Sequence, residues 1–277
     1  MTSRFSRFFI SASLLLCTLV GKAQGDLLIT PKRLVFDGTK RAEEINLANI
    51  GKDTTTYNIS FVQYRMNENG VFIPVSEEDS TMKFASKNLR FFPRTVTLAP
   101  NEAQTVKVQL IRASELAPGE YRSHLSFKNV FNSAALGEEG KPASKDQGIS
   151  VNIKPVFGIS IATIIRVGES SVTGSLSQTK FVPGTASTDP YISFNLNRAG
   201  NISLYGDIHV QFVGADNKAT EVALMKGLAV YLPNAYRTVQ IPLKKIPGID
   251  YASGKLLIDY TDPSAKNTSI CKTEIVF

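Results

Sequence analysis

Short segments rich in β-branched and aromatic residues recur along the chain, and turn-forming residues separate them. Successive residues of a strand point to opposite faces, so segments of this composition and length predict strands. No segment after residue 23 has convincing helical periodicity. The predicted strands cover residues 27–36, 57–64, 104–111, 121–130, 149–165, 191–196, 207–213, 222–231, 238–243, 255–260 and 270–277. Many short strands at near-regular spacing predict an all-β protein made of sandwiches or barrels.

The predicted strands form two blocks, residues 26–166 and 168–277. Each block is long enough for a sandwich of about seven strands, and domains commonly contain about 100 to 150 residues. We therefore expect an N-terminal sandwich domain at 26–166 and a C-terminal sandwich domain at 168–277. Residues 167–171, which include Gly168 and two serines, are the expected hinge.

The first residues have the layout of a secretory signal peptide. Arg4 and Arg7 precede an apolar run at residues 8–20, and small residues such as Ala23 follow it. We expect residues 1–23 to be the signal peptide. The apolar run is too short to span a bilayer, and no later segment approaches the roughly 18 to 20 apolar residues that a membrane helix needs. The sequence therefore predicts an exported protein without a membrane span.

Charge and reactive residues argue against several function classes. Loss of the signal peptide lowers the formal net charge from +7 to +4, and the remaining basic residues are scattered. Such a distribution argues against a nucleic-acid partner, because phosphate backbones bind dense basic tracts. After cleavage Cys271 is the single cysteine, so no internal disulfide can form. His124 and His209 lie in no catalytic, metal or phosphate-binding motif, so we expect no enzyme activity, metal or cofactor.

Residues 131–148 form a long polar loop in the sequence, and the strand that follows alternates clearly. Its odd positions are Ile149, Val151, Ile153, Pro155, Phe157, Ile159 and Ile161. Pro155 has no N–H to donate to a sheet ladder, which favours an edge strand or a bulge. A long apolar edge strand is an aggregation hazard unless a partner covers it. The row therefore either receives a partner or fills the core of its own sandwich.

Four segments of the first block resemble the periplasmic chaperones of the chaperone–usher pilus pathway, the PapD-like family. They are LITPKRLVFDG at 28–38, LAPNEAQTVKV at 98–108, LAPGEYRSHL at 116–125 and ISIATIIR at 159–166. The third resembles a divergent, non-classical branch of the family. The resemblance covers nearly all of the first block in the expected order, whereas the second block agrees only in length and strand character.

The resemblance implies two immunoglobulin-like β-sandwich domains in an angled tandem arrangement, in the periplasm. It implies that the last strand of the first domain enters the incomplete fold of a pilus or fimbrial subunit and supplies its missing strand. An outer-membrane usher is the second partner that it implies. The residues that would enter the subunit are Ile149, Val151, Ile153 and Phe157.

Family members also bind the subunit's terminal carboxylate with two basic residues between the domains. Arg33 matches the first of them, and a guanidinium can bind a carboxylate through two parallel bonds. The family's lysine position falls near Ala162, so the sequence departs from the pattern, and Lys154 is the substitute that we expect. The alternative function is a structural or adhesive cell-surface protein of tandem Ig-like domains, in which the same strand would be covered internally.

Overall fold

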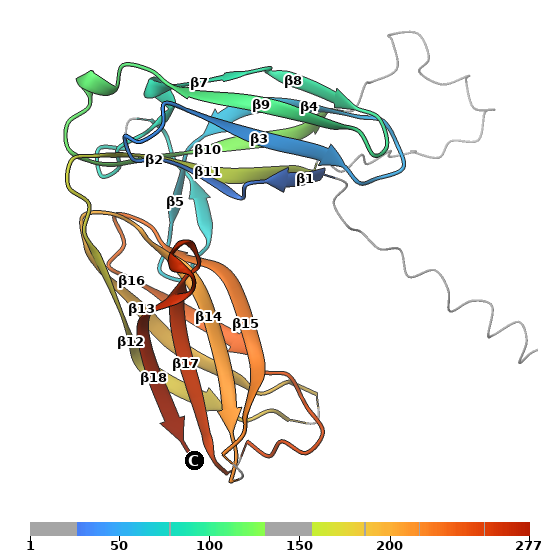
Figure 1. Cartoon of the computed structure of the whole chain (residues 1–277), viewed down its shortest axis with the longest axis vertical. Helices are drawn as coiled ribbons and strands as arrows, with labels where there is room; N and C mark the ends of the chain where they lie inside the picture. Colours follow the sequence, from blue (N-terminus) through green and yellow to red (C-terminus); the bar gives the residue numbers. More distant parts are fainter. Residues whose placement is uncertain (1–26, 78, 131–156, 186, 216, 252) are drawn as a thin grey trace, which may run out of the picture.

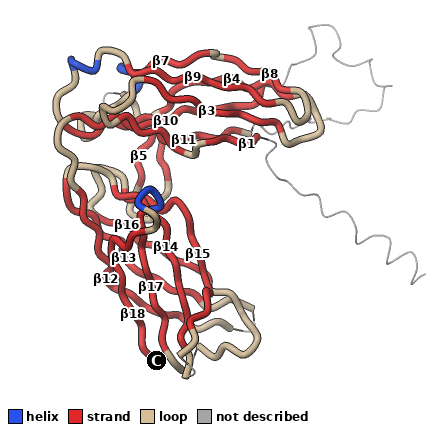
Figure 2. Tube along the Cα trace, in the orientation of Figure 1, coloured by secondary structure: helices blue, strands red, loops and turns tan. Residues whose placement is uncertain are grey.

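A computed structural model gives the structure of the chain and describes residues 27–77, 79–130, 157–185, 187–215, 217–251 and 253–277. Nearly all regular structure in this part of the chain is β, which confirms the predicted all-β fold of two sandwiches (Figure 2). The predicted signal peptide, together with Ile149, Val151, Ile153 and Lys154, lies outside the described residues. The described part of the chain contains no helix with the length and apolarity needed to cross a membrane.

The N-terminal sandwich has two facing sheets, ordered β1-β3-β9-β7 and β2-β11-β10-β4-β8. The strands of the first sheet are β1 (Leu27–Thr30), β3 (Ala42–Asn49), β9 (Ala103–Leu110) and β7 (Leu89–Phe92). The strands of the second are β2 (Arg33–Phe36), β11 (Gly158–Val167), β10 (Gly119–Val130), β4 (Thr55–Val62) and β8 (Thr95–Leu98). All pairs are antiparallel except that of β2 with β11, which is parallel.

The C-terminal sandwich has sheets ordered β12-β13-β16 and β15-β14-β17-β18. Their strands are β12 (Val172–Val182), β13 (Tyr191–Gly200), β14 (Leu204–Val213), β15 (Ala219–Val230), β16 (Tyr236–Pro242), β17 (Lys255–Asp262) and β18 (Thr268–Val276). The two sandwiches are set at an angle, and only residues 168–171 join β11 to β12 (Figure 1).

A hairpin and three 3-10 helices complete the fold. A two-stranded hairpin of β5 (Tyr64–Met66) and β6 (Phe72–Pro74) lies between the sandwiches (Figure 1). The 3-10 helices are η2 (Ser86–Asn88), η3 (Ala113–Glu115) and η4 (Pro263–Ala265).

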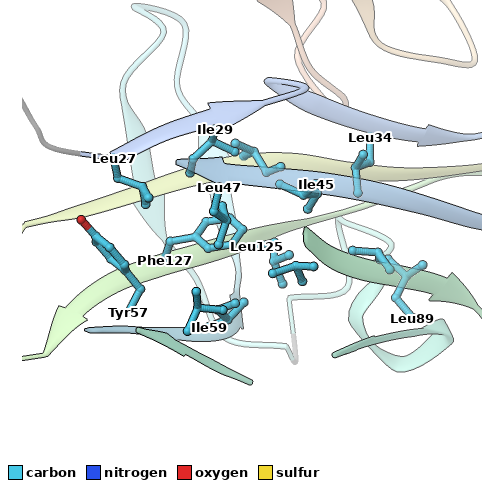
Figure 3. Close-up of a cluster of buried hydrophobic side chains, with 14 of the residues drawn as sticks. Leu27, Ile29, Leu34, Ile45, Leu47, Tyr57, Ile59, Leu89, Leu125 and Phe127 are labelled. Carbon is cyan, nitrogen blue, oxygen red and sulfur yellow. The ribbon is translucent and has the colours of Figure 1, made fainter. Parts of the chain in front are cut away.

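Alternating apolar residues build the N-terminal core, as strand periodicity requires. Ile45 and Leu47 of β3 are fully buried and face Phe127 and Leu125 of β10 (Figure 3). The C-terminal core is separate and includes Ile258 and Tyr260 of β17 among its fully buried side chains.

A third cluster of buried residues joins the two sandwiches. It contains Met66, Ala162, Ile164, Ala229 and Tyr231, which come from the hairpin, from β11 and from the end of β15. The two sandwiches are therefore in apolar contact with each other, in addition to being joined by residues 168–171.

One predicted strand divides in the structure, and several observed strands were not predicted. Residues 27–36 do not form one strand, because β1 pairs with β3 in one sheet whereas β2 pairs with β11 in the other. Pro31 between them lacks an N–H for either ladder. Six strands were not predicted from the sequence, namely β3, β5, β6, β7, β8 and β12. The burial of β12 is mostly intermediate and its residues are largely polar or small, so apolar alternation does not mark it.

Candidate functional site

The candidate site begins at the edge of β11. Strand β10 pairs with β11 along its whole length, whereas β2 covers the other edge only from Ala162 to Ile165. Among the described residues, no strand pairs with that second edge from Gly158 to Ile161. The end of β11 that follows residues 131–156 therefore has an open edge.

The ladder geometry tells which main-chain groups face this open edge. Asn129 donates its backbone N–H to the Phe157 carbonyl at 2.9 Å, so this pair is hydrogen-bonded toward β10. Hydrogen-bonded and non-hydrogen-bonded pairs alternate along an antiparallel ladder. Ile159 therefore also bonds toward β10, and the N–H and C=O groups of Gly158 and Ser160 point outward. These are the groups that a further strand would bond.

The apolar row of β11 divides into a buried and an exposed part. Ile161 and Ile165 belong to the N-terminal core, so at these positions the row does fill its own sandwich. Ile159 is 38% exposed and Phe157 is 61% exposed, although both have the same parity as Ile161. The exposed side chains thus continue the core row along the part of β11 that β2 does not cover, where Ile159 pairs with the fully buried Phe127.

Arg33 lies directly next to the open edge. It is the first residue of β2, and its register partner on β11 is Ala162, where the coverage by β2 begins. Its guanidinium carbon lies 4.0 Å from the ring centroid of Tyr205 in the C-terminal sandwich, within the range of a cation–π contact. Its Nη1 atom is buried and has no hydrogen-bond partner among the described residues. Arg33 is therefore a cation that is held against the Tyr205 ring and whose Nη1 can still donate a hydrogen bond.

A cleft of about 580 Å³ contains Arg33 and is lined by both sandwiches. Arg166, Ser203, Tyr205 and Ser264 are among its other polar residues. Burial is the main cause that lowers the pKa of Arg33, and the neighbouring Arg166 lowers it further, while Tyr231 opposes both. A carboxylate in the cleft would accept a hydrogen bond from Arg33 and would offset the repulsion between Arg33 and Arg166.

Arg166 itself is already paired. Its Nε donates to Glu120 at 3.1 Å, and its Nη2 donates to the Ser203 carbonyl at 3.3 Å. Glu120 has a side chain only 1% exposed and also accepts bonds from the backbone N–H and the hydroxyl of Ser203. This network joins β10 and β11 to the C-terminal sandwich and fixes one wall of the cleft. The sequence does not single out Glu120, Ser203 or Tyr205, because nothing local in it shows which residues meet across the interface.

A second buried polar group lies behind the hairpin. His124 is 3% exposed and is surrounded by the rings of Tyr64, Phe72 and Tyr231, with centroids 5.1 to 6.4 Å away. Neither ring nitrogen has a hydrogen-bond partner in the described part of the chain. Burial, followed by the charge of Arg122, lowers the pKa of His124 to about 3, so the imidazole is neutral at pH 7. His124 is therefore a packed residue among aromatic rings.

Comparison with known proteins gives structural similarity without sequence matches. No family model and no curated protein matches the chain. Among 136 matching chains of solved structures are the YadV chaperone, with 10% identity and a TM-score of 0.41, and the Pseudomonas aeruginosa CupB2 chaperone, with 8% and 0.45. These two matches cover 91% and 90% of this chain and 100% of the other chains. A CsuC–CsuE chaperone–tip adhesion subunit complex from archaic chaperone–usher Csu pili of Acinetobacter baumannii has 11% identity and a TM-score of 0.41, covering 90% of this chain and 97% of that chain.

Proposed function

We propose that the protein is a periplasmic chaperone that binds and caps pilus or fimbrial subunits by donating the edge strand β11. The observation that carries the proposal is the open edge at Gly158–Ile161, which ends beside Arg33, whose Nη1 has no hydrogen-bond partner among the described residues. An exposed edge that adds to an incomplete sheet is a known mode of peptide recognition, in which main-chain bonds give affinity and alternate side chains give specificity.

In this mechanism, a strand of the subunit bonds to the outward N–H and C=O groups of Gly158 and Ser160. Phe157 and Ile159 enter the groove of the subunit, and the sequence continues the same row through Ile149, Val151 and Ile153. The subunit thereby buries apolar surface that would otherwise drive its self-association.

Arg33 would anchor the chain terminus of the subunit. Because β2 begins at Arg33, a strand lying along Gly158–Ile161 meets the guanidinium where that coverage starts. A terminal carboxylate there would accept the free Nη1 bond, and the stacking on Tyr205 keeps the guanidinium in place. Lys154 is the second basic residue that we propose for this carboxylate, and an outer-membrane usher is the proposed receiver of the complex.

The test is affinity purification of the tagged protein from its native cell envelope, followed by mass spectrometry. We compare wild type, Ile159→Asp and the control Val276→Asp, which places the same charge at an exposed position of β18. A charged side chain cannot enter an apolar groove without a large desolvation cost. We expect a small β-rich subunit at equal stoichiometry with wild type and the control, and at least tenfold less with Ile159→Asp.

Two outcomes would contradict the proposal. Equal recovery of the subunit with Ile159→Asp would exclude donation through this edge. Recovery of the protein alone, or embedded in the cell surface, would instead support a structural or adhesive protein. Arg33→Gln and Arg33→Lys test the anchor separately: the proposal expects weaker capture with Gln than with Lys, because Lys retains the charge.

A further inference from the structure

The hairpin of β5 and β6 leaves the N-terminal sandwich and reaches the C-terminal one (Figure 1). Its three pairs run from Tyr64 with Pro74 to Met66 with Phe72, and residues 67–71 form the tip. An isolated two-stranded ribbon is marginally stable at best. Its position must therefore depend on the groups that it contacts.

The tip of the hairpin bonds to the edge strand β16. The Thr238 backbone N–H donates to the Glu68 carbonyl at 2.7 Å, and the Asn234 side-chain amide donates to the Met66 carbonyl at 2.8 Å. The Tyr236 hydroxyl also bonds to the Glu68 carboxylate, and this bond raises the pKa of Tyr236. Because β16 is the last strand of its sheet, the tip covers an edge that would otherwise be open.

Gly70 lies in the tip of the hairpin, next to the Arg237 side chain of the C-terminal sandwich. Its φ of +80° is a left-handed conformation, and a Cβ placed there would collide with the guanidinium of Arg237. That guanidinium is held on the C-terminal sandwich by a bond from Nη1 to the Ala229 carbonyl at 3.3 Å. An added Cβ at residue 70 would therefore strain the backbone at this positive φ and would force the Arg237 guanidinium to move from its bond with Ala229.

The base of the hairpin belongs to the apolar interface. Met66 is 1% exposed in the cluster with Ala162 and Tyr231, and the Phe72 ring lies 6.0 Å from that of Tyr231. The hairpin therefore contacts the C-terminal sandwich both at its base and at its tip. The Glu120–Arg166–Ser203 network is a further attachment, formed by β10 and β11 and not by the hairpin.

We infer that the hairpin of β5 and β6 is a strap that fixes the C-terminal sandwich relative to the N-terminal one, and that Gly70 allows this strap to close. A covalent hinge of four residues leaves rotation free, whereas attachments at separate places remove it. The strap thereby keeps Arg33 and Tyr205, which come from different sandwiches, in the contact that forms the cleft. This inference goes beyond the proposed function and does not depend on the identity of any partner.

The experiment measures the distance distribution between the sandwiches by double electron–electron resonance. Spin labels are placed at Lys107→Cys on β9 and Ala219→Cys on β15, in exported protein that carries Cys271→Ser. The test variant is Gly70→Ala. The matched control is Gly248→Ala, because Gly248 has a φ of +86° and no atom within 4 Å of an added Cβ, so it brings backbone strain without a collision.

We expect wild type and Gly248→Ala to give the same narrow distribution, and Gly70→Ala to give one at least twice as wide. The double variant Gly70→Ala with Arg237→Ala removes the collision between the added Cβ and the guanidinium. Its distance distribution should be narrower than that of Gly70→Ala alone. The double variant Asn234→Ala with Tyr236→Phe removes two tethers without touching the hairpin, so it tests the strap even if Gly70→Ala fails to fold. A distribution as narrow as wild type in this double variant, or in folded Gly70→Ala, would overturn the inference.

Discussion

Replacement of His124 by Phe should remove an acid sensitivity that the fold creates. The imidazole is buried in a cage of aromatic rings, and both of its nitrogens lack hydrogen-bond partners among the described residues. No acidic group is among the causes that shift its pKa, and the one charged neighbour among them is the cation of Arg122. The folded state therefore stabilises the neutral form of the His124 imidazole relative to the protonated form.

The sign and size of the effect follow from linkage. The pKa of His124 is about 3 in the folded state, below its ordinary value of 6.5. Stability is therefore fully present above about pH 6.5 and is lost as the pH falls from 6.5 toward 3, because the unfolded state binds the proton first. The loss approaches about 1.4 kcal/mol per pH unit, which gives about 2 kcal/mol between pH 7 and pH 5. The lowered pKa values of Asp37 and Asp79 act at lower pH and contribute little in this interval.

The assay is urea unfolding at pH 7, 6 and 5 for wild type, His124→Phe and His209→Gln. Phe keeps a ring among Tyr64, Phe72 and Tyr231, and it removes two unsatisfied nitrogens, so we expect no loss of stability at pH 7. The difference in unfolding free energy between His124→Phe and wild type should grow by about 2 kcal/mol from pH 7 to pH 5. His209→Gln, at a half-exposed site, controls for loss of a histidine. A difference that stays constant across the three pH values would refute the reasoning.

Two further predictions concern the interface and the core. Glu120→Gln should destabilise the protein by about 3 kcal/mol, because it leaves the partly buried Arg166 without its counter-charge. The control Glu274→Gln removes an exposed ion pair with Lys255 and should lower the unfolding free energy by less than about 1 kcal/mol. Equal losses of unfolding free energy for the two variants in urea would contradict the role of Glu120 as the counter-charge of Arg166. Phe127→Ala should cost about 3 to 5 kcal/mol because the ring is fully buried. Phe92→Ala, at a ring that is 77% exposed, should lie within about 0.5 kcal/mol of wild type by thermal unfolding.

Alternation in the sequence predicted several of the strands that have one apolar face, although it did not find β3, in which Ile45 and Leu47 are buried. Residues 104–111 were predicted as a strand, and β9 spans Ala103–Leu110 with Val106, Val108 and Leu110 buried. By contrast, β12 has few large apolar residues, and β1 and β2 are separate strands because the chain changes sheets at Pro31. Strand patterns report which side chains are buried but not which sheet a strand joins.

The candidate site was only partly predictable for a similar reason. Arg33 and the apolar row before Ile161 could be chosen from the sequence, and the structure places Arg33 at the open edge. Their neighbours Tyr205 and Ser203 lie about 170 residues from Arg33 along the chain, so only the folded interface brings them together. The hairpin strap was missed because its strands, β5 and β6, are three residues each and pack on the other sandwich.

The most direct test of strand donation is amide hydrogen exchange of β11, measured by NMR on the free protein and on the complex recovered with its subunit. The N–H groups of Gly158 and Ser160 point to the open edge, whereas those of Ala162 and Ile164 point to β2, so we expect the latter two to be protected in both states. The account predicts that exchange at Gly158 and Ser160 slows at least tenfold in the complex while Ala162 and Ile164 change little. Unchanged exchange at Gly158 and Ser160 in a formed complex would show that the subunit is bound elsewhere.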